Sequence, residues 1–109
     1  ANQGELALQT GQTDRAIRYL EEAITLDRET ENLPGLGHDL TLLAQAREQR
    51  NEPDRALELY RQANAIAQHT GQHDQAQRVH RAIERLEHES GVRLPQSRVK
   101  SAEWDGRSE

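Results

Sequence analysis

The chain has 109 residues, of which 33% are hydrophobic, and a formal net charge of -5. This length allows one compact domain or a few stacked repeats. The chain has no cysteine, so it forms no disulfide and no thiolate metal site. It has no long apolar run, so no membrane span is expected, and its mild acidity argues against nucleic acid binding.

The composition predicts a thin core built from alanine and leucine. Leucine, isoleucine and valine together number 20, alanine occurs 13 times, and phenylalanine is absent. Alanine has the highest helix propensity, and its small side chain lets two helices approach closely. The low net charge and the regular spacing of the apolar residues favour a folded helical chain over a disordered one.

Five amphipathic helices are predicted in chain order, near residues 1–10, 13–31, 34–50, 53–69 and 73–89. Apolar residues recur at steps of three and four, which is the helical period and not the alternation of a strand. From the second helix to the fifth they are Ala16, Leu20, Ala23, Ile24 and Leu26; Leu36, Leu40, Leu43 and Ala44; Ala56, Leu57, Tyr60, Ala63 and Ile66; and Ala76, Val79, Ile83 and Leu86.

The breaks between the helices carry turn residues. Gly11 and Gly71 suit the C-terminal end of a helix, and Pro34 and Pro53 suit the first turn of the next one. A shift of 40 residues also superimposes the sequence on itself, so that 14–16 falls on 54–56 with three identities. The chain is therefore expected to contain repeated helical hairpins.

The repeated positions resemble tetratricopeptide repeats. That family has a small residue early in its first helix, a turn residue, and then a small, a bulky and a small residue in its second helix. The five positions are filled by Gly4, Gly11, Ala16, Leu20 and Ala23 in one copy and by Ala44, Asn51, Ala56, Tyr60 and Ala63 in the next. The resemblance implies an all-α fold of antiparallel helical hairpins, stacked as a short right-handed α-solenoid of about five helices.

The repeat is longer than the common family unit of about 34 residues. We expect the extra residues around 28–36, in a longer second helix or a longer loop, and HEAT-like or armadillo repeats are the structural alternative. The expected units are 1–31 and 34–69, followed by a capping helix at 73–89 and a polar tail or linker at 91–109 that contains Trp104. Because the helical pattern already starts at Ala1, we expect the chain to be a fragment of a longer protein.

The resemblance also implies a binding groove, since the first helix of each family unit lines a concave surface that holds partner peptides. The positions carried over to this groove are Glu5, Leu8 and Gln9; His38, Thr41, Gln45, Glu48 and Gln49; and Arg78, Arg81, Arg85, His88 and Glu89. The three arginines share one helix face and would suit an acidic peptide or a terminal carboxylate. The alternative is that they pair with Glu84, Glu87 and Glu89 on their own helix.

No motif in the sequence predicts an enzyme or a cofactor site. His80, Glu84 and His88 share a helix face and could in principle hold zinc, but a solvated polar stripe is the favoured interpretation. We expect a scaffold that binds a partner peptide or helix in the groove. The alternative is a regulatory or sensor segment that binds a small molecule or gates another domain. An apolar pocket between the helices would favour this alternative, and an open polar surface would favour the scaffold.

The first helix is expected to expose an apolar edge around Leu6 and Leu8. Terminal repeats without a polar cap leave core side chains in contact with water, so this edge predicts self-association of the chain.

Overall fold

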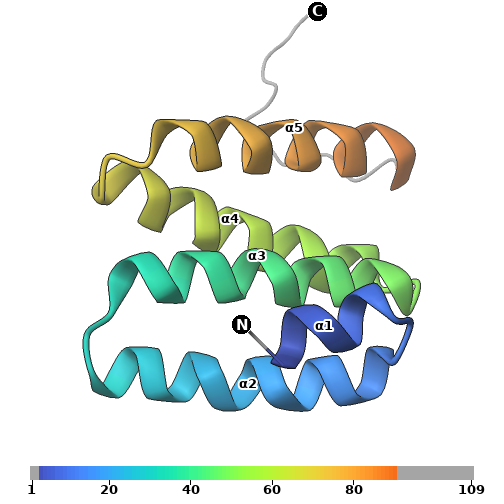
Figure 1. Ribbon diagram of the computed structural model, residues 1–109. Coiled ribbons are helices and arrows are strands. Elements are labelled where there is room, and N and C mark those ends of the chain that lie inside the picture. The colour runs from blue at the N-terminus through green and yellow to red at the C-terminus, as the bar shows by residue number, and fades with distance from the viewer. Residues whose placement is uncertain (1–2, 91–109) are drawn as a thin grey trace, which may run out of the picture.

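The computed structural model describes residues 3–90, and the regular structure of this part is entirely helical (Figure 1). The helices are α1 (Gln3–Gln9), α2 (Thr13–Glu29), α3 (Leu33–Gln49), α4 (Pro53–His69) and α5 (His73–Ser90). Every helix end lies within two residues of its predicted position. The predicted tail at 91–109, with Trp104, lies outside the described residues.

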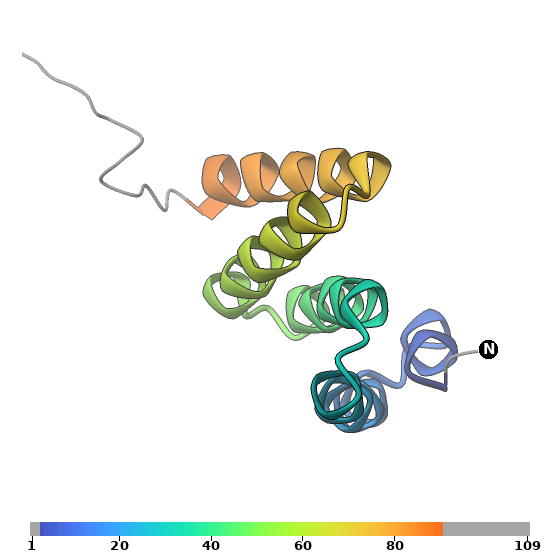
Figure 2. The ribbon, with the colours of Figure 1, turned by 90° about the vertical axis from the view of Figure 1, so that its left-hand side faces the viewer.

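The helices stack in chain order. Each packs against the next, and α1 also contacts α3. Figure 2 shows the helices following one another around the stack, with α1 and α5 at its two ends. This arrangement confirms the predicted all-α repeat fold, in which α1–α2 and α3–α4 are two successive hairpins. None of the helices within residues 3–90 is long and apolar enough to cross a membrane.

The four turns between the helices are built alike. Gly11, Glu31, Asn51 and Gly71 follow one another at intervals of 20 residues and all have positive φ, between 55° and 80°. In each turn the next backbone N–H closes the helix end; that of Gln12, for example, donates to the Ala7 carbonyl at 2.8 Å. Of the two places expected for the extra residues, the longer loop is wrong, because the turn at residues 30–32 is no longer than the others, and the longer second helix is the one found. The extra length lies in the helices, since α2, α3 and α4 each have 17 residues.

Small residues let the two helices of each hairpin pack closely. Ala16, Ala56 and Ala63 are fully buried, as is the bulky Leu20, while Ala23 is only half-buried. The close approach expected at four alanines is therefore found at three of them.

The apolar face of α2 ends differently from its prediction. Leu26 was expected in the core, but 59% of it is exposed, and Asp27 is buried in its place. The helical period explains this, because a step of three from Ile24 leads to Asp27 and not to Leu26. One carboxylate oxygen of Asp27 accepts a hydrogen bond from the Asn32 side-chain amide at 3.4 Å.

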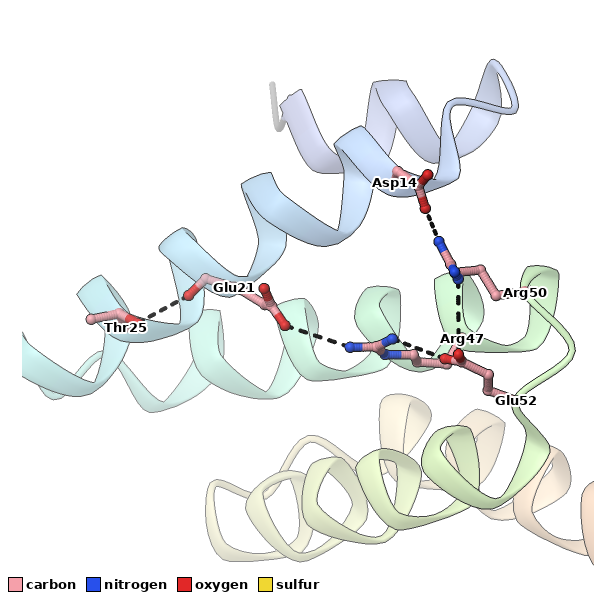
Figure 3. A network of polar contacts seen from close by, with 6 residues as sticks. All are labelled: Asp14, Glu21, Thr25, Arg47, Arg50 and Glu52. Atoms are coloured by element: carbon pink, nitrogen blue, oxygen red, sulfur yellow. Dashed lines mark hydrogen bonds and ion pairs between the residues drawn. The ribbon is translucent and has the colours of Figure 1, made fainter.

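Ion pairs link α2 to the end of α3 (Figure 3). The Arg47 guanidinium lies between Glu21 of α2, at 3.5 Å, and Glu52 of the following turn, at 2.8 Å. Arg50 pairs with Asp14 at the start of α2 and lies 3.9 Å from Glu52. These contacts fix α2 against α3, and so they fix the first hairpin relative to the second.

Candidate functional site: a groove along α1, α3 and α5

A groove of about 620 Å³ runs along the first helices of the repeats. It collects side chains from α1, α3 and α5, with one residue from α4. The lining residues are Glu5, His38, Thr41, Leu42, Gln45, Glu48, Tyr60, Gln75, Arg78, Val79, Arg81, Ala82 and Arg85. Most of these residues have polar or charged side chains.

The apolar residues of the groove form its floor. Leu42 and Val79 are buried core residues of α3 and α5, and Tyr60 reaches the groove from α4. The Tyr60 hydroxyl donates a hydrogen bond to a Glu48 carboxylate oxygen at 2.5 Å. Burial, and then this hydrogen bond, raise the pKa of Tyr60 well above its ordinary value. The hydroxyl is therefore protonated at neutral pH and able to donate to Glu48.

Glu48 also joins α3 to α5. The Arg85 guanidinium lies 2.9 Å from one Glu48 carboxylate oxygen and 3.6 Å from Glu89 on its own helix. The hydrogen bond to Glu48 raises the pKa of Arg85. Because two carboxylates lie within 4 Å of the Arg85 guanidinium, its charge is largely compensated by residues of the protein itself, although the side chain is partly exposed.

Two further bridges cross the groove between its helices. The Gln75 side-chain amide donates to the Thr41 hydroxyl at 3.3 Å, which joins α5 to α3. The His38 imidazole lies 3.9 Å from a Glu5 carboxylate oxygen, which joins α3 to α1 when the histidine is protonated. These side chains hold the three helices of the groove together.

Three predicted groove residues are left without such a bridge. Gln45, Arg78 and Arg81 are exposed, and neither arginine forms an ion pair with any residue in 3–90. The acidic residues on the same helix form no ion pair with either arginine: Glu87 pairs with Arg61 and Glu89 with Arg85, and Glu84 lies 3.2 Å from His80, which is a charged partner only when the histidine is protonated. The expected pairing on the same helix thus occurs for Arg85 and not for Arg78 or Arg81.

The structure brings together seven of the eight predicted partner-binding residues, namely His38, Thr41, Gln45, Glu48, Arg78, Arg81 and Arg85. Gln49 does not line the groove, because its side chain accepts a hydrogen bond from the Thr13 hydroxyl at 2.7 Å and donates to the Leu8 carbonyl at 3.4 Å. It therefore tethers α3 to the first hairpin.

The more distant positions implied by the family differ in their placement. Glu5 lines the groove, whereas Gln9, His88 and Glu89 do not. Leu8 is buried in the core, because the C-terminal half of α1 packs onto α2 and α3. Its expected place in the groove and on an exposed edge was wrong.

Sequence reasoning missed Tyr60 and Gln75 as groove residues. Tyr60 occupies a core position of the repeat, and only its hydroxyl, which needs a partner when buried, indicated a second role. Gln75 lies one helical turn before Arg78 and so shares its face. That spacing could have identified it.

The histidines of α5 form no metal centre within the described residues. His80 and Glu84 are adjacent, but no group of three potential ligands in residues 3–90 could hold a metal ion.

A family model described as tetratricopeptide repeat matches residues 1–69. Because this match covers more than half of the chain, the protein belongs to the tetratricopeptide repeat family. Neither the curated proteins nor the solved structures gave a match. Tetratricopeptide repeats generally mediate protein–protein interactions, and the geometry of the groove bears on what this one could hold.

Proposed function

We propose that the protein is a scaffold whose groove holds an extended acidic segment of a protein partner. The observation that carries this proposal is that Arg78 and Arg81 line the groove from α5 without an ion-pair partner in residues 3–90. The neutral amide of Gln45 lines the groove from α3. Guanidinium groups bind carboxylates with two parallel hydrogen bonds, and an amide both donates and accepts. Together they suit a peptide with acidic side chains or a terminal carboxylate.

The polar bridges support a preformed site. Glu48, Tyr60 and Arg85 form one connected set of hydrogen bonds across α3, α4 and α5, and the Gln75–Thr41 hydrogen bond is a second link between α5 and α3. A ligand then meets helices that are already held in place, so that less ordering opposes binding. Arg85 takes no direct part in this proposal, because its charge is already compensated.

The sensor alternative would need a pocket enclosed by apolar side chains. The many hydrogen-bonding side chains that line this open groove support a peptide ligand instead, because peptides offer many hydrogen-bonding groups along their length.

Selection from a random 12-residue peptide library on the immobilised chain tests the proposal. Binders enriched in aspartate and glutamate are expected, with affinity that falls as salt rises. The double variant Arg78→Gln/Arg81→Gln should lose them. The control Arg18→Gln/Arg55→Gln removes the same charge from exposed positions of α2 and α4 and should keep them. Binders without acidic enrichment, or binders that survive the groove variant, would contradict the proposal.

A further inference from the structure

Equivalent positions on the three first helices change their charge along the stack. Glu5, Gln45 and Arg85 occupy the same place in α1, α3 and α5, at intervals of 40 residues, and all three line the groove. Across the groove, this position is therefore acidic on α1, neutral on α3 and basic on α5.

Two neighbouring positions repeat the change between α3 and α5. His38 on α3 corresponds to Arg78 on α5, and Thr41 corresponds to Arg81, again 40 residues apart and all in the lining. Positive charge thus gathers on the α5 side, where Arg78 and Arg81 have no ion pair with residues 3–90. The order of the charges is set by the side chains of this chain and not by the repeat fold.

The α1 side of the groove is acidic. Among the described residues, Glu5 is the only one of α1 in the lining, and its side chain is 43% exposed, so a ligand can reach the carboxylate. The His38 imidazole, 3.9 Å away, forms an ion pair with it only when protonated. The other carboxylate of the lining, Glu48, accepts hydrogen bonds from Tyr60 and Arg85. A ligand that crosses the groove therefore meets a carboxylate on α1 and two guanidinium groups on α5.

A uniformly acidic ligand does not match this arrangement. Its carboxylates suit Arg78 and Arg81, but a carboxylate that reaches α1 is repelled by Glu5. A basic side chain at the same place would gain an ion pair instead. The order of charges in the groove thus contributes to the choice of ligand, since it favours one charge pattern and disfavours another.

We propose that the partner segment carries a basic residue for Glu5 at a distance from the acidic residues that bind Arg78 and Arg81. This inference rests on the proposed function, which it extends from an acidic segment to a charge-separated one. Packed helices lie about 10 Å apart, so two helix spacings separate α5 from α1 by about 20 Å. An extended chain covers about 3.3 Å per residue, which places the basic residue about six positions from the acidic ones.

Two peptides of identical composition test the separation of charges. The probe is Asp-Asp-Ala-Thr-Ala-Thr-Ala-Lys, and the matched peptide is Asp-Asp-Lys-Ala-Thr-Ala-Thr-Ala, both with blocked ends. Each is also made in the reverse order, because side-chain charges do not fix the direction of the peptide chain. In one direction the separated peptide should bind the full chain about threefold more tightly than the matched one in an NMR titration at low salt, as expected for one exposed ion pair.

Variants of the chain locate the contact. Glu5→Gln should remove the difference between the two peptides, and Glu5→Lys should reverse it. Glu58→Gln, the same change at an exposed residue of α4 outside the groove, should leave the difference unchanged. Thermal melting shows whether the variants fold, and the two peptides on the parent chain decide the question without any variant.

The double variant Arg78→Gln/Arg81→Gln separates this inference from the proposed function. If it loses both peptides while the parent binds the two equally in both directions, the acidic site stands and the charge-separated ligand is overturned. A difference between the peptides that persists in Glu5→Gln would overturn it as well. Peptides that bind the arginine variant as tightly as the parent, or that bind neither protein, would overturn both proposals.

Discussion

The two repeats share one backbone plan but differ in their polar chemistry. Glu48 and Tyr60 of the second repeat form a hydrogen-bonded set with Arg85 of the following helix, α5. Forty residues earlier, the corresponding positions hold Leu8, Leu20 and Gln45, of which both leucines are buried. The polar bridge is therefore found only between the second repeat and α5, because two of the three corresponding positions in the first repeat are buried leucines and the third, Gln45, is exposed in the groove.

The second helix of each hairpin packs against the helix that follows it, α2 against α3 and α4 against α5. An ion pair crosses each of these two junctions, but the acidic and basic residues are exchanged between them. At the α2–α3 junction the acid is on α2 and the base on α3, as Glu21 and Arg47. At the α4–α5 junction the order is reversed, as Arg61 and Glu87. Exchanging α2 and α4 would bring like charges together at both junctions, so the reversal favours stacking in chain order.

The largest expected loss of stability tests the close helix packing that the two repeats have in common. Ala16 and Ala56 occupy corresponding, fully buried positions. Replacing either with leucine should overpack its hairpin and lower the free energy of unfolding by about 1–3 kcal/mol. Ala65→Leu, at an exposed position of α4, is the control and should have little effect. Denaturant unfolding that shows no change for Ala56→Leu would contradict the common packing.

The next effect concerns the polar set of the second repeat. Tyr60→Phe removes the hydroxyl that donates to Glu48 and should cost about 1 kcal/mol at neutral pH. The pKa of Tyr60 is raised above its ordinary value of 10.0. Its contribution is therefore complete below pH 10 and is lost as the pH rises toward the raised pKa. Unfolding followed by circular dichroism from pH 8 to 11 should show a steeper loss for the parent than for Tyr60→Phe. Parallel curves would show that this tyrosine is not the titrating group.

A smaller effect is expected at the α4–α5 junction. Both side chains of the Arg61–Glu87 pair are less than a third exposed, and Arg61→Glu would place two carboxylates together. We expect a loss of about 0.5–1 kcal/mol. The double variant Arg61→Glu/Glu87→Arg should recover most of it, because it restores the pair in the direction seen at the other junction. A double variant no more stable than the single one would argue against a direct pair.

The smallest effect is expected at the α2–α3 junction. Glu21 is 55% exposed, and Arg47 has a second ion-pair partner, Glu52 at 2.8 Å, which a change at Glu21 leaves in place. Glu21→Arg should cost only about 0.3 kcal/mol. A loss as large as that of Arg61→Glu in the same denaturant titration would mean that the two junctions depend equally on their ion pairs.

Much of the fold could be predicted from the sequence, because helix period and repeat spacing are local signals. The same repeat placed Arg78, Arg81 and Gln45 on the helices that line the groove. It could not show that Glu48 compensates Arg85, since the two residues are 37 positions apart and meet only when α3 and α5 are packed. Nor could it show that Leu8 is buried, which depends on how α1 packs onto its neighbours.

The central claim is that Arg78 and Arg81 receive the partner while Arg85 remains paired with Glu48. The most direct measurement is the NMR spectrum of the arginine side-chain Nε–H groups during titration with a selected acidic peptide. The account predicts large shifts for Arg78 and Arg81 and a small shift for Arg85, with no change at Arg18 and Arg55 on the second helices. Binding that leaves Arg78 and Arg81 unshifted, or that shifts all arginines alike, would contradict it.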